Sequence, residues 1–251
     1  MNNMPYSLVP EDAMPTPLGL IVLRADETLE PELHKAFARD PVALYVSRIP
    51  SAPTVTPDTL RAMEADIVAS ADLLPKSLDY AVVGYGCTSA SAIIGSEAVA
   101  MRVKSACNAK EVTNPLHAAI SYAKHHGLSK LALLSPYVDA VNVPLRAAFS
   151  KAGLSTDVFG TFGEAEEAKV ARIDEASILD AAVNLGRNAD ADGLFLSCTN
   201  LKTLNVLPKI QERLGKPVFS SNSALTWHMK NCANIRKINQ LIKLSHSRLR
   251  M

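Results

Sequence analysis

The 251-residue sequence lacks the features that mark several large classes of protein. No uninterrupted apolar run reaches the roughly 18 residues that suggest a membrane-spanning helix, and residues 1–17 have neither the basic nor the apolar segment of a secretory signal. The motif GxGxxG is missing, since Gly84-Tyr85-Gly86 lacks the third glycine, and so is the phosphate loop GxxxxGKS or GxxxxGKT. These absences favour a cytoplasmic protein without nucleotide chemistry.

An excess of one charge is also missing, because 26 Lys and Arg residues face 25 Asp and Glu residues and leave a net charge of +1. A balanced surface creates no field that would attract nucleic acid or an anionic membrane, so we expect neither as a partner. Cysteine is scarce as well: there are four, with no CxxC pair and no Cys/His cluster. Free thiols in a reducing compartment are therefore expected, with no disulfide framework and no metal site.

What the sequence does contain is apolar residues, 48% of the chain, in a pattern that occurs twice. A continuous apolar run at residues 18–23, typical of a parallel strand buried on both faces, is followed by a helical pattern at 28–37. Similar segments recur about 111 residues later, at 131–134 and 141–152. The second strands of the two halves are expected at 43–46 and 155–159, and the next helices at 59–74 and 176–185.

Strands and helices that alternate in this way predict an α/β fold with a parallel sheet in each half. We expect the two halves to be related by pseudo-twofold symmetry, with the active site between them. Short strands at 111–115 and 218–223 end in Asn114 and in Ser220, Ser221 and Asn222. The helix after Asn114 is predicted to cross into the second half, and the chain after Asn222 to return to the first. The predicted domains are residues 1–122 plus 222–251, and residues 123–221.

Two of the cysteines lie at matching points of this repeat. Cys87 and Cys198 each follow an apolar strand and begin a turn of small polar residues, and they are 111 positions apart. Active sites of parallel sheets form at the carboxyl ends of the strands, so the two thiols could face one another. A thiol at the start of a helix meets unpaired N–H groups that favour the thiolate, and we expect a lowering of its pKa by about one unit or more.

Four motifs, in order, resemble the aspartate/glutamate racemase superfamily and, within it, the maleate isomerase and arylmalonate decarboxylase branch. They are the segments at residues 86–91, 135–142, 196–201 and 214–222, with the sequences GCTSAS, SPYVDAVN, LSCTNL and LGKPVFSSN. The opening segment at 23–30, LRADETLE, is most similar to members associated with ectoine and hydroxyectoine utilisation.

The resemblance implies a cofactor-independent racemase or isomerase that acts on a small carboxylate, with Cys87 and Cys198 as the catalytic pair. It also implies a homodimer or higher homo-oligomer. By analogy with the family, the substrate and its anionic intermediate would be held by Thr88, Ser89, Asn114, Tyr137, Thr199, Asn200 and Asn222. Alternative interpretations stay open: Tyr137 could simply close a strand, and Asn114 and Asn222 could be turn-forming residues.

Two positions depart from the family pattern. Asp26 and Glu167 stand where maleate isomerases have asparagines that hold carboxylates. Two acidic side chains in the site would repel a substrate that carries two negative charges. The hypothesis is that the substrate carries a positive group, such as an ammonium or an amidinium, beside one carboxylate. Alternatively, Asp26 only caps the helix that follows it.

Other activities compete with racemisation of an amino acid or another zwitterion. Maleate cis-trans isomerisation needs both thiols, whereas arylmalonate decarboxylases have glycine at the position of Cys87. A non-catalytic ligand sensor could use the same fold.

The stretch from Arg213 to the end has eight Lys or Arg residues and no Asp or Glu, and its apolar spacing predicts an amphipathic helix. We expect that helix to pack on the first domain or on a second subunit, and attachment to a membrane surface is the alternative.

Overall fold

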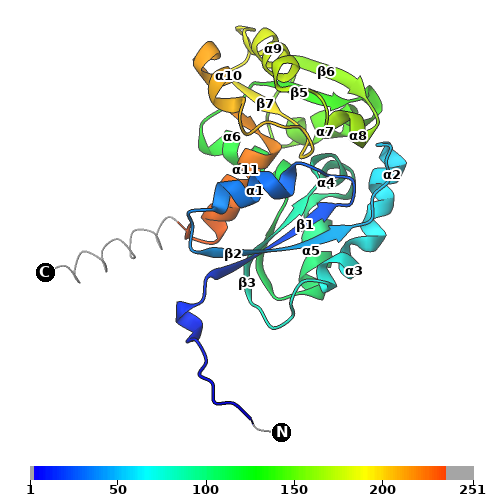
Figure 1. Ribbon diagram of the computed structural model, residues 1–251. Helices are drawn as coiled ribbons and strands as arrows, with labels where there is room; N and C mark the ends of the chain where they lie inside the picture. Colours follow the sequence, from blue (N-terminus) through cyan, green and yellow to red (C-terminus); the bar gives the residue numbers. More distant parts are fainter. Residues whose placement is uncertain (1–2, 236–251) are drawn as a thin grey trace, which may run out of the picture.

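The computed structural model describes residues 3–235, and over that range the chain forms two four-stranded parallel sheets (Figure 1). The strand order is β2-β1-β3-β4 in the first sheet and β6-β5-β7-β8 in the second, so both sheets have the same topology. The first sheet contains β1 (Thr16–Leu23), β2 (Val42–Ile49), β3 (Tyr80–Gly86) and β4 (Ala109–Thr113). The second contains β5 (Leu131–Tyr137), β6 (Phe159–Glu164), β7 (Gly193–Leu196) and β8 (Val218–Ser220). The predicted α/β fold with two parallel sheets is confirmed.

The central strands follow from the apolar runs in the sequence. In β1 every residue from Leu18 to Leu23 is buried, and in β5 every residue is buried. Each strand pairs with a neighbour on both sides, β1 with β2 and β3, and β5 with β6 and β7. A strand covered by helices on both faces cannot alternate polar and apolar residues, which is why these runs are continuous.

Helices cover the faces of both sheets. In the first part of the chain they are α1 (Leu29–Phe37), α2 (Pro57–Ala62), α3 (Ile67–Asp72), α4 (Thr88–Ile94) and α5 (Ser96–Ala106), with 3₁₀ turns η1 (Glu11–Ala13) and η2 (Met63–Asp66). The later helices are α6 (Pro115–His125), α7 (Asp139–Lys151), α8 (Glu167–Val170), α9 (Glu175–Gly186), α10 (Leu207–Leu214) and α11 (Ser221–Cys232).

Helices α6 and α11 pack across the boundary between the halves. Although α6 follows β4 of the first sheet, its residues share a core cluster with Leu133 and Phe219 of the second sheet. Conversely, α11 follows β8 but shares a cluster with Leu20 and Val82 of the first sheet. The two helices also contact each other. The predicted boundaries at 122 and 221 fall within α6 and at the start of α11, and the division into domains stays a prediction.

Several predicted elements are wrong in their extent. The short strands expected at 111–115 and 218–223 end at Thr113 and Ser220, and α6 and α11 begin at Pro115 and Ser221. The second strand of the later half was expected at 155–159, but β6 is Phe159–Glu164, and Ser155 forms only an isolated bridge with Lys130. The helix expected at 59–74 is divided into α2, η2 and α3. Its apolar positions Leu60, Met63 and Ile67 are all buried. These apolar residues stay on the inner face through the 3₁₀ turn. Apolar spacing alone therefore does not show where the α-helix changes to a 3₁₀ helix.

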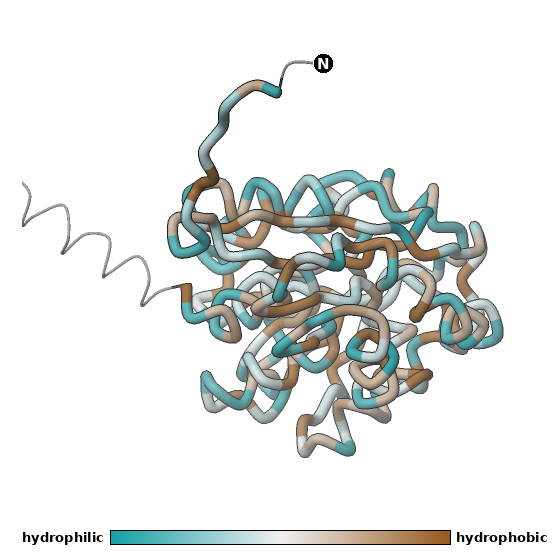
Figure 2. Tube along the Cα trace, turned by 90° about the horizontal axis from the view of Figure 1, so that it is seen from below, coloured by the Kyte–Doolittle hydropathy of each residue, from teal (hydrophilic) through white to brown (hydrophobic). Residues whose placement is uncertain are grey.

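The start of the described chain projects from the body of the molecule (Figures 1 and 2). Met4, Tyr6 and Leu8 in this segment are exposed. The amphipathic helix predicted near the C-terminus lies beyond Ile235, outside the described residues. Among the helices of residues 3–235, none is long and apolar enough to cross a membrane.

Candidate active site

The carboxyl ends of strands from both sheets surround one small cavity. It is lined by Leu23, Asp26, Cys87, Thr88, Ser89, Tyr137, Glu167, Cys198 and Thr199, which come from both halves of the chain. The cavity has a volume of about 10 Å³, which is room for a single water molecule. Any larger molecule therefore requires the surrounding segments to move apart.

Cys87 reaches this cavity as the N-cap of α4. Its Sγ accepts a hydrogen bond from the Ala90 N–H at 3.3 Å, and its carbonyl accepts one from the Ser91 hydroxyl at 2.6 Å. A residue at this position meets the unpaired N–H groups of the first helical turn. The local sequence thus fixes the thiol of Cys87 at the positive end of a helix, as predicted.

Cys198 is held in a different way. Its backbone has a φ of 97°, a left-handed conformation that is unusual for a residue other than glycine. The Cys198 N–H donates to the Ser221 Oγ at 3.0 Å, and the Asn200 N–H donates to the Cys198 Sγ at 3.2 Å. The chain then continues as a loop until α10, so Cys198 is not at the start of a helix. The two thiols occupy equivalent strand ends but have unequal environments.

Ser221, which the sequence analysis did not single out as a site residue, joins the two halves beneath the thiols. Its Oγ lies 2.8 Å from the Thr88 Oγ1 of α4 and also accepts the Cys198 N–H. We expect Ser221→Ala to lower the free energy of unfolding by about 1–3 kcal/mol, because a buried N–H and a buried hydroxyl lose their partner. Urea denaturation measures this change, and Ser105→Ala on the exposed side of α5 should stay within about 0.5 kcal/mol. An equal effect of the two substitutions would contradict the structural role of Ser221.

Tyr137, Glu167 and Asn200 form a buried hydrogen-bond network around Cys198. The Tyr137 hydroxyl donates to Glu167 Oε1 at 2.7 Å and lies 3.0 Å from the Cys198 Sγ. The Asn200 Nδ2 donates to the other oxygen of the carboxyl, Glu167 Oε2, at 2.8 Å. Both oxygens of Glu167 therefore have partners within the protein.

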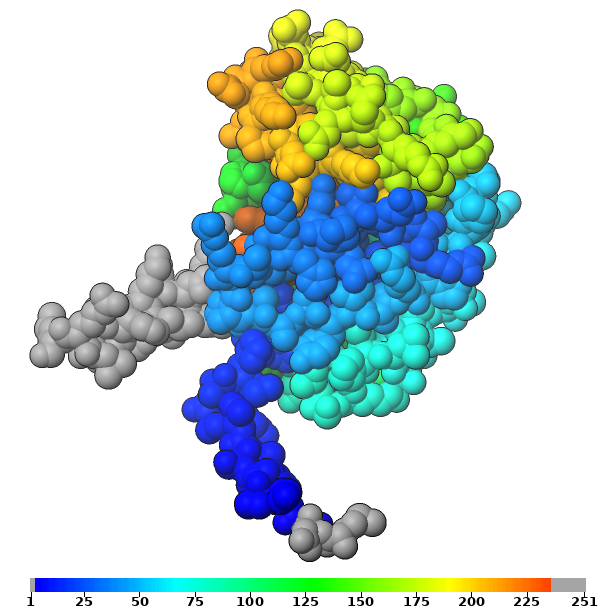
Figure 3. All heavy atoms as spheres, in the orientation of Figure 1, coloured from blue at the N-terminus to red at the C-terminus, as the bar shows by residue number. Residues whose placement is uncertain are grey.

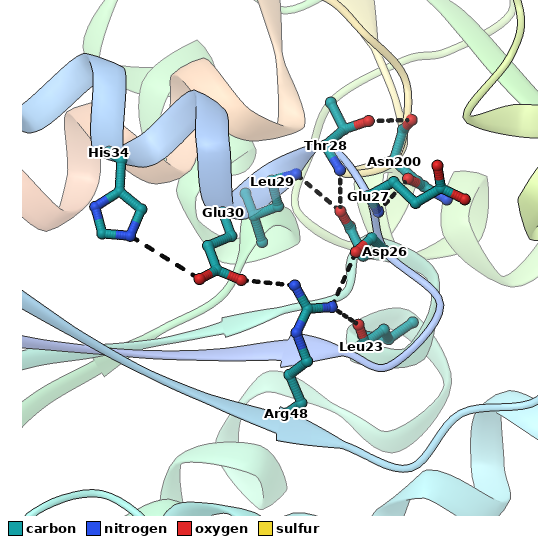
Figure 4. Close-up of polar contacts among 9 residues, drawn as sticks. All are labelled: Leu23, Asp26, Glu27, Thr28, Leu29, Glu30, His34, Arg48 and Asn200. Atoms are coloured by element: carbon teal, nitrogen blue, oxygen red, sulfur yellow. Dashed lines mark hydrogen bonds and ion pairs between the residues drawn. The ribbon is translucent and has the colours of Figure 1, made fainter.

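One carboxyl oxygen of Asp26 bonds backbone N–H groups at the start of α1 (Figure 4), and Asp26 also lines the cavity. Its Oδ1 accepts hydrogen bonds from the N–H groups of Thr28 and Leu29, both at 2.8 Å. The guanidinium of Arg48 donates to the carbonyls of Leu23 and Asp26 and pairs with Glu30, so it does not bond the Asp26 carboxylate. Oδ2 of Asp26 has no hydrogen-bond partner among the described residues. The N-cap of α1 is Thr28, so Asp26 is not the N-cap acid of the alternative interpretation, although its Oδ1 bonds the N–H of the first helical residue. The Thr199 side chain lowers the pKa of the Asp26 carboxyl, but less than burial raises it.

Contacts from α1 and from the two residues before it hold the loop that carries Cys198 against the first half, and Figure 3 shows the two halves meeting along this side. The Thr28 hydroxyl donates to the Asn200 carbonyl at 2.9 Å, and the Glu27 N–H donates to Asn200 Oδ1 at 2.9 Å. Glu32 accepts the N–H groups of Thr203 and Leu204 at 3.1 and 3.0 Å. The sequence did not predict a role for Glu32 in the site, because its only distinctive property there is its position beside the apolar residues of an amphipathic helix.

Burial dominates the electrostatics of the cavity. It raises the pKa of Cys87 to about 12 and the pKa of Cys198 well above its ordinary value, and the carboxyls of Glu167 and Asp26 raise both further. The Ala90 N–H lowers the pKa of Cys87 and the Tyr137 hydroxyl lowers that of Cys198, but less than burial raises them. The expected lowering of the thiol pKa is therefore wrong for this closed cavity. Burial also raises the pKa of the Asp26 and Glu167 carboxyls.

The remaining predicted residues differ in their distance from the cavity. Ser89 lines it with a buried hydroxyl that has no partner among the described residues, and Thr199 lines it beside Cys198. Asn114 lies outside the lining: its Oδ1 caps α6 by accepting the His117 N–H at 2.9 Å. Asn222 also lies outside, and its Nδ2 donates to the Thr199 carbonyl at 2.9 Å and to Glu32. Asn114 is the N-cap of α6 and Asn222 lies in the first turn of α11, so neither is the turn-forming residue of the alternative interpretation, and their role in substrate binding stays a prediction.

Comparison with known proteins identifies relatives with this architecture. Residues 18–242 match the family model for arylmalonate decarboxylase. The chain is 36% identical to arylmalonate decarboxylase of Bordetella bronchiseptica over 102 residues, which are 40% of this chain and 42% of that protein. The matched segment thus spans less than half of that relative.

Two solved structures are similar over most of the chain. A liganded arylmalonate decarboxylase variant, with one glycine changed to cysteine and one cysteine to serine, superposes with a TM-score of 0.76 and 26% identity over 88% of this chain and 93% of that one. A cysteine-to-alanine variant of the maleate isomerase from Pseudomonas putida S16, solved with maleate, has a TM-score of 0.78 and 21% identity over 88% and 92%.

Proposed function

The chain belongs to the arylmalonate decarboxylase family, whose members are cofactor-independent enzymes that act on small carboxylates, and we propose that it is a two-cysteine racemase or isomerase. The observation that carries this proposal is that Cys87 and Cys198, from equivalent strand ends of the two halves, line the same small cavity. In racemisation one thiolate removes the α-proton and the opposite thiol returns a proton to the other face. Thr88, Ser89 and Thr199 border the same space, and the unpartnered hydroxyl of Ser89 can donate a hydrogen bond to the anionic intermediate.

The charge of the cavity supports a substrate that carries a positive group. Asp26 and Glu167 both line it, and no Lys or Arg is among its lining residues. Glu167 has partners on both oxygens, whereas Asp26 Oδ2 has none, so Asp26 is the residue that would hold an ammonium or amidinium. A dianion such as maleate would meet two carboxyls and no cation. A zwitterion such as an amino acid fits better, and the compounds of ectoine and hydroxyectoine breakdown belong to this class.

Decarboxylation is the second candidate, because the matched family model and the curated relative are both described as arylmalonate decarboxylase. One-sided protonation after loss of CO₂ needs one thiol. The presence of Cys87 opposite Cys198 favours chemistry on two faces, which a decarboxylase does not require.

Proton exchange at the α-carbon tests the proposal. The protein is incubated in D₂O with aspartate, glutamate, diaminobutyrate, hydroxylated diaminobutyrate, maleate and a phenylmalonate, and products are followed by NMR and chiral chromatography. We expect deuterium incorporation with loss of optical purity for one of the amino acids. Conversion of maleate alone would show that the activity is cis-trans isomerisation and not racemisation. Release of CO₂ from phenylmalonate alone would show that the protein is a decarboxylase.

A further inference from the structure

An unbroken chain of hydrogen bonds connects the Cys198 thiol to a buried carboxyl. The Cys198 Sγ lies 3.0 Å from the Tyr137 hydroxyl, which donates to Glu167 Oε1 at 2.7 Å. Relative exposure is 3% for Cys198, 5% for Tyr137 and 4% for Glu167. Because the single hydroxyl proton of Tyr137 is directed at Glu167, the Tyr137 oxygen is free to accept the S–H of Cys198. The three groups are thus aligned for transfer of a proton from sulfur to carboxylate.

This alignment answers a difficulty that the cavity poses for thiol chemistry. Loss of the Cys198 proton to solvent would place a second negative charge beside Glu167, and burial together with that carboxyl raises the pKa of the thiol. Burial also raises the pKa of Glu167, so its carboxylate is a better proton acceptor than an exposed one. Transfer within the chain leaves the total buried charge unchanged and avoids the cost of a new one.

We propose that Glu167 is the acceptor of the Cys198 proton, which it receives through the Tyr137 hydroxyl. In this step the S–H bond breaks as the Tyr137 oxygen gains that proton, and the original hydroxyl proton forms the new O–H bond on Glu167 Oε1. No electrons are gained or lost, and the negative charge moves from the carboxylate to sulfur. In the product, Glu167 donates to the Tyr137 oxygen and the Tyr137 hydroxyl donates to the thiolate. Tyr137 and Glu167 are positioning residues in this step, since they act through Cys198.

The surroundings support both ends of the transfer. Asn200 donates from Nδ2 to Glu167 Oε2 at 2.8 Å and from its backbone N–H to the Cys198 Sγ at 3.2 Å. The other titratable groups that face the network are Asp26 and Cys87, which line the same cavity. Asp26 raises the pKa of both Glu167 and Cys198, but it forms no hydrogen bond with either of them.

Cys87 has no equivalent chain. Its Sγ accepts the backbone N–H of Ala90, and among the described residues no side chain forms a hydrogen bond with it. If the proposed two-thiol function holds, on which this step rests, Cys198 is the thiolate that begins the reaction and Cys87 is the thiol that donates from the opposite face. The unequal environments of two equivalent strand ends thereby correspond to unequal roles.

Alkylation of Cys198 by iodoacetamide tests the proton transfer without any substrate. The rate is measured on the Cys198 peptide by mass spectrometry, between pH 5 and 10, in the full-length protein and in Glu167→Gln and Tyr137→Phe. If Glu167 acted only through its charge, its neutralisation would make the thiolate easier to form and alkylation faster. The proton-acceptor role predicts the opposite, a loss of at least about tenfold near pH 7.

The pH profile gives a second criterion. In the unsubstituted protein the rate should rise with the ionisation of Glu167 and then stay level, since above that point the network holds two protons, on Cys198 and Tyr137, and Glu167 can accept one. In Glu167→Gln the level region should disappear and the rate should rise steadily with pH. Tyr137→Phe should give the same profile, and the double variant should show no further loss.

Asp26→Asn is the matched control, because it removes a carboxyl from the same cavity that has no bond to Tyr137. Its Cys198 alkylation should be unchanged or faster, and Cys87 alkylation in Glu167→Gln should not fall. Circular dichroism tests whether each variant is folded. If Glu167→Gln does not fold, the same prediction is tested with Tyr137→Phe. Unchanged or faster Cys198 alkylation in a folded Glu167→Gln or Tyr137→Phe protein would overturn the proposal.

The two experiments distinguish failure of the proton transfer from failure of the proposed activity. Loss of Cys198 alkylation without proton exchange on any carboxylate would leave the transfer intact and reject the function. Proton exchange with unchanged alkylation in Glu167→Gln would retain the function and reject the transfer.

Discussion

Replacement of either Cys87 or Cys198 by serine should lower the rate of α-proton exchange coupled to racemisation by at least about 10³-fold. Both thiols line the single cavity in which the strand ends of the two halves meet. A serine hydroxyl is a far weaker acid than a thiol, so it can neither form the anion nor return the proton at a useful rate. The measurement is the initial rate of racemisation of the responding amino acid, followed by chiral chromatography.

Cys107→Ser is the control for the thiol substitutions. Cys107 is buried in the core, where its Sγ donates a hydrogen bond to the Val103 carbonyl at 3.5 Å, and it does not line the cavity. The racemisation rate of Cys107→Ser should stay within about twofold of that of the original protein. Full turnover in Cys87→Ser would contradict the two-thiol account and favour one-sided chemistry such as decarboxylation.

The second large effect is expected on charge selectivity. Asp26→Asn should raise the KM for a zwitterionic substrate relative to a dicarboxylate by about 10- to 100-fold, because the free Oδ2 would lose the charge that pairs with the substrate cation. The amide oxygen of asparagine can still accept the N–H groups of Thr28 and Leu29, so these bonds at the start of α1 are retained. Steady-state kinetics with both classes of ligand measure the ratio.

Glu30→Gln is the matched control for this charge change. Glu30 lies four residues further along and pairs with Arg48 at 2.6 Å outside the cavity. It should leave the ratio of the two KM values unchanged. An equal loss for zwitterionic and dianionic ligands in Asp26→Asn would reject the role of Asp26 as the cation partner.

The fold was predictable because its buried strands leave a direct record in the sequence. The apolar run at 18–23 is typical of a strand covered on both faces, and β1 has that burial. The run at 131–134 predicted β5 correctly but ended before Tyr137, since Ser135 and Pro136 interrupt the apolar pattern although both are buried. The strand expected at 155–159 failed because Thr156 and Val158 mimic its alternation, whereas the ladder with β5 begins only at Phe159.

Site residues that follow strand ends could be predicted from the sequence. Residues whose role depends on contacts with distant parts of the chain could not. Cys87, Asp26 and Tyr137 lie at the carboxyl ends of β3, β1 and β5, so topology alone brings them together. Ser221 and Glu32 were missed because their roles depend on partners more than 100 residues away, Thr88 and Thr203. The pKa of the thiols was also mispredicted, since a sequence shows the helix start at Cys87 but not the depth of its burial.

The most direct test of two thiols acting from opposite faces is the position of deuterium early in racemisation. One enantiomer of the responding amino acid is allowed to react in D₂O to a few per cent conversion, and the isotope content of both enantiomers is measured. We predict that the product enantiomer carries deuterium at the α-carbon while the remaining substrate retains its proton, because one thiol removes the proton and the other supplies a solvent-derived one. Equal deuterium content in both enantiomers would show that a single group serves both faces and would contradict the account.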